Sequence, residues 1–82
     1  MQDREKTIRE VIEIVAEIAD LPVAEVAPDA TLEELGIDSL NGLRIVAAVE
    51  KRFGVNIPDE EIGKIRTMPQ IFALVDTHPP EE

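Results

Sequence analysis

Residues 31–54 read TLEELGIDSLNGLRIVAAVEKRFG, a stretch that contains both ends of one predicted helix. Asp38 and Ser39 suit its start, because their side-chain oxygens can accept hydrogen bonds from the free amides of a first turn. Gly54 suits its end, because glycine readily adopts the left-handed conformation that terminates many helices. Apolar residues recur between these ends at helical spacing: Leu40, Leu43, Val46, Val49 and Phe53, with Ile45 and Ala47 on the flanks. We expect this stripe to face the core.

Three other segments have helical patterns. A first helix is expected from residue 3 to residue 19, with an apolar face formed by Ile8, Val11, Ile12, Val15, Ile18 and Ala19. Residues 59–61 are acidic and open a short helix, since negative charge suits the positive helix end. Thr67 caps a final helix that has Pro69 in its first turn. The predicted fold is all-α, a small bundle of three longer helices plus one short helix, with a long loop between the first and second helices.

The long loop, residues 20–38, has its own stop and cap signals. Pro22 and Pro28 interrupt helices, and Thr31 followed by Glu34 fits a capping box, in which each side chain accepts from the other residue's amide. Every charged residue of this loop is acidic: Asp20, Glu25, Asp29, Glu33, Glu34 and Asp38. A connection this long inside a compact domain is usually functional or packed by its own side chains.

The composition limits the size and the partners of the protein. Its 82 residues suit one domain, expected at residues 1–75, followed by a flexible acidic tail at residues 76–82. Without cysteine it can form neither disulfides nor thiolate metal sites. The net charge of −10 disfavours nucleic acids and anionic membranes and favours basic protein partners. No apolar run approaches the ~20 residues of a membrane span and no signal-peptide pattern is present, so we expect a cytoplasmic monomer without stable membrane insertion.

Catalysis by the chain itself is not expected. Ser39 is the single serine and His78 the single histidine, and a nucleophilic triad would need them together although His78 lies in the predicted tail. No metal-ligand spacing and no phosphate-binding glycine loop is present. From the residues alone, Ser39 has two interpretations. It is either a helix cap, or an exposed hydroxyl at a place where free amides and the helix dipole favour a phosphate.

The residues around Ser39 resemble a known attachment motif. Leu35-Gly36-Ile37-Asp38-Ser39-Leu40 is similar to the modification site of acyl carrier proteins. Further residues fall at that family's spacing after the serine: Glu50, Phe53, residues 57–61, Lys64, Ile65 and Thr67. The resemblance is strong over residues 31–75 and looser through the first predicted helix.

The resemblance implies a carrier function. A phosphopantetheinyl transferase, the holo-synthase, would move 4′-phosphopantetheine from coenzyme A to Ser39, with Asp38 and Leu40 beside it. Acyl groups would then be carried as thioesters, and acyl-transfer and ketosynthase-type enzymes are the implied partners. The acyl chain would fold back into a space lined by Val46, Val49, Ile57, Ile65 and Leu74. The implied partner-binding residues are Asn41, Arg44, Ala47, Ala48, Glu50, Lys51 and Ile57.

The chain departs from the family pattern on the second long helix. Asn41 and Arg44 stand where acids are common, which favours a specialised lipid or polyketide pathway over general fatty-acid synthesis. Alternatives remain open: a peptidyl or aminoacyl carrier, a polyketide carrier, and an unmodified acidic interaction module in which Ser39 is only a cap. Gly36 followed by Ile37, rather than paired glycines before the serine, favours the acyl class.

Overall fold

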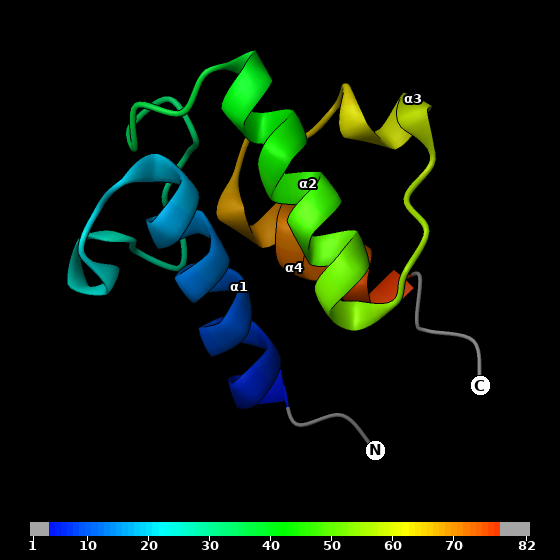
Figure 1. The fold of residues 1–82 in the computed structure, drawn as a ribbon, viewed down its shortest axis with the longest axis horizontal. Helices are drawn as coiled ribbons and strands as arrows, with labels where there is room; N and C mark the ends of the chain where they lie inside the picture. Colours follow the sequence, from blue (N-terminus) through cyan, green and yellow to red (C-terminus); the bar gives the residue numbers. More distant parts are fainter. Residues whose placement is uncertain (1–3, 78–82) are drawn as a thin grey trace.

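A computed structural model describes residues 4–77 and contains five helical segments in that range. They are α1 (Arg4–Ala19), the short 3₁₀ helix η1 (Val23–Glu25), α2 (Ser39–Phe53), α3 (Asp59–Ile62) and α4 (Met68–Thr77). The predicted all-α fold of three longer helices and a short one is confirmed, and the long loop lies between α1 and α2 (Figure 1). The predicted tail began at residue 76, but α4 continues through Thr77. Residues 78–82, which include His78, lie outside the described part.

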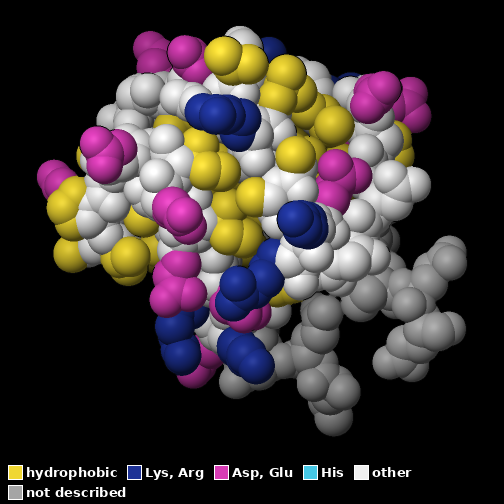
Figure 2. Space-filling model, in the orientation of Figure 1, with side chains coloured by type: hydrophobic (Ala, Val, Ile, Leu, Met, Phe, Trp, Pro, Cys, Tyr) yellow, Lys and Arg dark blue, Asp and Glu magenta, His cyan; other side chains and the backbone are white. Residues whose placement is uncertain are grey.

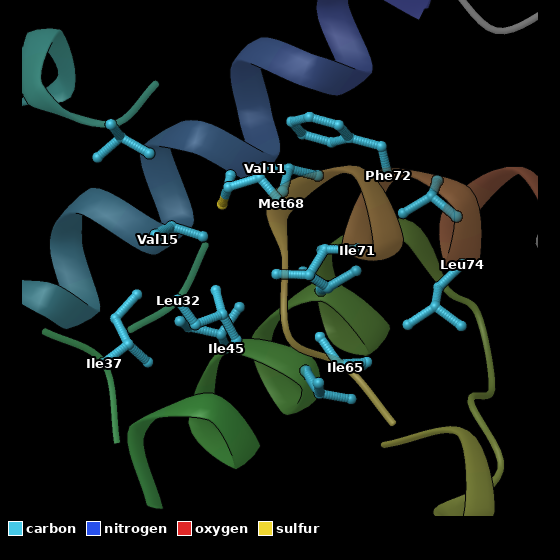
Figure 3. Close-up of a cluster of buried hydrophobic side chains, with 14 of the residues drawn as sticks. Val11, Val15, Leu32, Ile37, Ile45, Ile65, Met68, Ile71, Phe72 and Leu74 are labelled. Carbon is cyan, nitrogen blue, oxygen red and sulfur yellow. The ribbon is translucent and has the colours of Figure 1, made fainter. Parts of the chain in front are cut away.

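The three longer helices enclose one aliphatic core. Helices α1, α2 and α4 each contact the other two, and in Figure 1 α4 lies behind α2. The largest fully buried side chains come from these three helices: Val11, Val15, Ile45, Val49, Met68, Ile71 and Val75. Figure 3 shows Leu32 and Ile37 of the long loop joining the same cluster. The loop is therefore packed by its own apolar side chains, as its length suggested.

The buried face of α2 differs from the predicted stripe. Ile45 is fully buried, whereas Leu40 is 67% exposed and Leu43 is 52% exposed. The prediction that Leu40 and Leu43 face the core is therefore wrong. Two apolar stripes overlap on this helix. Val46, Val49 and Phe53 of the predicted stripe are buried or partly buried as expected, and Ile45 joins them in place of Leu40 and Leu43. Periodicity identifies both stripes but not which of them meets the neighbouring helices.

The two ends of α2 match their predicted signals. The Oδ1 atom of Asp38 accepts a hydrogen bond from the Asn41 amide at 2.9 Å, so Asp38 is the N-cap. Gly54 has φ of 68°, and its amide donates to the Glu50 carbonyl. A side chain at position 54 would be strained in this left-handed conformation. These local hydrogen bonds set the first helical residue at Ser39.

The predicted capping box in the long loop is present. The Thr31 amide donates to Oε1 of Glu34 at 2.9 Å, and the Glu34 amide donates to Oγ1 of Thr31 at 3.1 Å. The hydrogen bonds from the Thr31 backbone and hydroxyl lower the pKa of Glu34, because they favour the ionised carboxylate. Their contribution to stability is therefore complete above the ordinary pKa of glutamate and is lost as the pH falls through the lowered value.

A second capping box lies at the start of α4 and faces the first. The Gln70 amide donates to Oγ1 of Thr67, as a cap at Thr67 predicted, and Oε1 of Gln70 accepts from the Thr67 amide at 3.0 Å. Thr31 and Thr67 pair as an isolated antiparallel bridge. Its two hydrogen bonds run from the Leu32 amide to the Arg66 carbonyl at 2.9 Å and from the Met68 amide to the Ala30 carbonyl at 3.0 Å. This threonine bridge fastens the long loop to the start of α4.

We expect salt to raise the melting temperature, because the loop between α1 and α2 carries six acids and no base. Salt at physiological strength screens exposed charges beyond about 8 Å. The double variant Glu25→Gln/Asp29→Asn removes two exposed acids outside both capping boxes. It should melt about 5 °C higher than the wild type in low salt, corresponding to about 1 kcal/mol, and should respond less to added salt. Equal salt dependence of the two proteins by circular dichroism would contradict this expectation.

Candidate functional site

Ser39 is the first residue of α2, and its side chain is exposed. Asp38 supplies the cap, so the Ser39 hydroxyl is not used to start the helix. Within the described residues, no hydrogen bond to that hydroxyl is present. The first amides of a helix have no carbonyl partner within it, and the dipole places partial positive charge there. A phosphate ester on Ser39 would meet these groups, with the Asp38 carboxylate opposing it.

An open cavity of about 700 Å³ lies beside Ser39, between α2, the long loop and the segment containing α3. Its apolar lining comes from all three parts: Leu32, Ile37, Leu43, Val46, Ile62 and Ile65. The exposed charged residues Glu33, Asp38, Asp59 and Arg66 also border it. The cavity thus offers an apolar interior with a mostly acidic edge next to an exposed hydroxyl.

Gly42 keeps the cavity open beneath Ser39. It lies one helical turn after the serine and lines the same cavity. A Cβ atom built at this position would meet no other atom within 4 Å. A group attached to Ser39 therefore has free space along α2 toward Val46.

The structure brings two of the five predicted acyl-chain residues to this cavity. Val46 and Ile65 are buried side chains that line it, whereas Val49 and Ile57 are buried in the core without lining it. Leu74 is buried too and borders a second hollow of about 260 Å³ that also touches Ile65. Four cavity residues were not expected from the sequence: Leu32, Ile37, Leu43 and Ile62. Leu32 and Ile37 belong to the long loop. The expectation that this loop is packed by its own apolar side chains was the sequence signal that could have identified them.

The predicted partner-binding residues separate into three groups. Arg44, Ala47 and Lys51 are exposed along one side of α2, together with Leu40, which was expected beside the attachment serine. Asn41, Ala48 and Glu50 are half-buried, and Ile57 is only 4% exposed. Leu43, which we expected in the core, joins the exposed group. The surface that a partner can reach on α2 therefore contains two leucines and two cations.

Two charged residues of α2 are engaged within the protein. Oε2 of Glu50 accepts a hydrogen bond from the Ile57 amide at 2.8 Å and so holds the segment before α3. Nη2 of Arg52 lies 2.7 Å from Oε1 of Glu10 and links α2 to α1. This hydrogen bond and the charge of Glu10 raise the pKa of Arg52. Glu50 and Arg52 therefore have structural roles.

Two further properties of the described residues concern metal binding and membranes. Among residues 4–77, no group of three or more histidine, cysteine, aspartate or glutamate residues is arranged to hold a metal ion. In the same range, none of the helices has both the length and the apolar character needed to cross a membrane.

Comparison with known proteins relates this geometry to a family. A family model described as a phosphopantetheine attachment site matches residues 9–75. The acyl carrier protein of Acidothermus cellulolyticus is 35% identical over 66 residues, which cover 79% of each chain. That of Micrococcus luteus is 36% identical over 77 residues, 93% of this chain and 95% of the relative.

A solved structure and a much longer protein also match this chain. The crystal structure of an acyl carrier protein from Thermotoga maritima has a TM-score of 0.79 and 34% identity, and the match covers 90% of this chain and 87% of that one. A non-reducing polyketide synthase from Emericella nidulans is 30% identical over 73 residues, 89% of this chain but 3% of the synthase. The matched family model and the two acyl carrier proteins above 30% identity confirm the resemblance seen in the sequence. This chain therefore belongs to the acyl carrier protein family, whose members carry a covalently attached 4′-phosphopantetheine arm and are carriers rather than catalysts.

Proposed function

We propose that Ser39 is the attachment point of the 4′-phosphopantetheine arm and that the chain presents acyl thioesters to enzymes of a biosynthetic pathway. One observation carries the assignment: Ser39 is exposed at the start of α2, its hydroxyl is free of the capping role, and it borders an open apolar cavity. Asp38 holds the first turn in place, and Leu40 is exposed next to the serine. The alternative in which Ser39 serves only as a cap is disfavoured, because Asp38 caps the helix.

The acyl chain enters the cavity through the space beside Gly42 and contacts Val46 and Ile65. Val49, Ile57 and Leu74 form deeper walls that a longer chain reaches when the cavity enlarges. Enlargement is favoured on the α3 side, because α3 has a single turn and none of its residues is fully buried. The tight packing between α1, α2 and α4 would resist entry from the other side.

The pathway is a specialised one rather than general fatty-acid synthesis. Arg44 and Lys51 are exposed on α2, whereas the resemblance leads us to expect acids there. The carrier receives its arm from a phosphopantetheinyl transferase and then serves acyl-transfer and ketosynthase-type enzymes. It acts as a cytoplasmic monomer, in keeping with a net charge of −10, which opposes self-association.

The test is an intact-mass measurement after incubation with coenzyme A and a phosphopantetheinyl transferase of broad specificity. The protein is expected to gain the mass of one phosphopantetheine group, and peptide mapping should place that group on Ser39. A peptidyl carrier would gain the same arm but would be charged by an amino-acid-activating enzyme rather than by an acyl transferase. A protein that gains no mass under these conditions would be an unmodified interaction module.

A further inference from the structure

The resemblance implies that partner enzymes dock on α2; we infer that the enzyme that docks on the exposed side of α2 in this chain has a contact surface formed by an apolar recess with an acidic rim. We call this side the α2 docking face and define it as Leu40, Leu43, Arg44, Ala47 and Lys51. The inference deepens the proposed function, because it rests on acyl delivery from Ser39 and specifies the chemistry of the enzyme that receives the cargo.

The α2 docking face has the arrangement of an interface. Its residues follow helical spacing, so they lie on one side of the helix. Leu40 and Leu43 are, with Val23, the large hydrophobic side chains that remain exposed in the described part of the chain. Figure 2 shows hydrophobic and Lys or Arg side chains next to one another over α2. An apolar centre with a charged rim is the usual anatomy of a protein interface.

The charge of this face is opposite to that of the whole protein. Arg52 is paired with Glu10, and the Glu50 carboxylate is turned to the Ile57 amide. Asp38 is engaged as the helix cap. Arg44 and Lys51 thus remain exposed on α2, while Glu50, the acidic residue of this helix, is bound to the Ile57 amide. This local positive charge contrasts with the net charge of −10 of the whole chain. A partner complementary to this face is acidic, and a basic one is repelled.

A protein partner fits these observations better than a membrane does. A cationic and apolar helix face could also approach anionic lipid, but the loop that leads to Ser39 carries six acids and the whole chain is strongly negative. Those charges would be repelled by an anionic bilayer. A protein can place acids opposite Arg44 and Lys51 alone and can receive Leu40 in a recess. Because Leu40 is next to Ser39, binding of this leucine in the recess also positions the arm at the entrance of the enzyme's active site.

The experiment compares two ketosynthases that differ only in surface charge. One has a basic carrier-docking surface, and in the other the arginines and lysines of that surface are replaced by glutamate. Each is assayed for kcat/KM with the acyl-loaded wild type and with Arg44→Glu/Lys51→Glu, from low to high ionic strength. Arg9→Glu/Lys64→Glu is the matched control, because it changes the net charge equally at exposed positions on α1 and after α3.

The basic ketosynthase should prefer Arg44→Glu/Lys51→Glu over the wild type by about tenfold at low salt, chiefly through faster association. The ketosynthase with the acidic surface should show the reverse preference, and both differences should shrink as salt is added. The control variant should react like the wild type with both enzymes. The double variant Leu40→Ala/Leu43→Ala should lose about tenfold in kcat/KM with the acidic-surface enzyme at every salt concentration, because it loses apolar contacts, which salt does not screen.

Equal rates for the wild type and the charge-reversed variant with both enzymes would overturn the inference, as would an equal response of the control variant. So would wild-type binding to phosphatidylserine vesicles that is lost in Arg44→Glu/Lys51→Glu while the ketosynthase rates stay unchanged. Mass spectrometry before each assay distinguishes a failure of the proposed function from a failure of the α2 docking face. A wild type that carries no arm on Ser39 counts against the proposed function, whereas a loaded chain without charge preference counts against the α2 docking face alone.

Discussion

Replacing Ser39 with alanine is expected to abolish phosphopantetheine loading completely while leaving the fold intact. The physical reason is that the hydroxyl is the proposed nucleophile for the arm but has no part in capping, which Asp38 performs. Alanine is also the better helix former at an exposed helical position. Intact mass should therefore show no gain after incubation with coenzyme A and the transferase, and the free energy of unfolding should change by less than about 0.5 kcal/mol.

The matched variant is Asp38→Ala, which keeps the hydroxyl and removes the cap. It should cost about 1 kcal/mol of stability, the usual loss for an N-cap carboxylate. The two substitutions, made at adjacent residues, thus separate modification from folding. A phosphopantetheine group found on Ser39→Ala, or on another residue of the wild type, would contradict the assignment of the site.

The second large effect is expected in the core. Ile45→Ala should destabilise the protein by about 2–5 kcal/mol, because Ile45 is fully buried and its removal leaves a cavity. Domains of this size are stable by only about 5–15 kcal/mol, and each kcal/mol shifts the melting temperature by about 4–8 °C. Urea unfolding followed by circular dichroism measures the loss.

Leu43→Ala provides the comparison two residues away on the same helix. Leu43 is 52% exposed, so its truncation should cost less than about 1 kcal/mol. The predicted apolar stripe of α2 placed Leu43 in the core and Ile45 on the flank, and it would give the opposite order. Equal destabilisation by the two substitutions would mean that α2 is rotated relative to the position described here.

The features that could be predicted from the sequence are those set by residues close together in the chain. Asp38 caps the amide three residues later, and Thr31 and Glu34 cap each other over the same interval. Gly54 ends α2 through its own left-handed conformation. Such contacts form wherever the local residues allow them, so helix boundaries and the exposed start of α2 followed from the sequence.

The features that could not be predicted depend on distant parts of the chain. Which stripe of α2 is buried depends on where α1 and α4 lie, and periodicity does not contain that information. The cavity beside Ser39 includes Leu32 and Ile62, which come together there only because the long loop and α3 both fold next to α2. Glu50 was expected on the partner surface, yet it reaches the Ile57 amide across the turn that follows α2.

The threonine bridge has a mechanical consequence for loading. The segment that carries α3 is held at one end by the Glu50–Ile57 hydrogen bond and at the other by the bridge at Arg66. Residues 58–65 are therefore tied to the rest of the protein at both ends, and Leu32 and Ile37, which line the same cavity, are joined to the start of α4 through the same bridge. If this segment moves outward to admit cargo, its displacement is bounded by its contour length of about 3.5 Å per residue. In that case the two attachments, rather than the three-helix core, limit the size of the cargo.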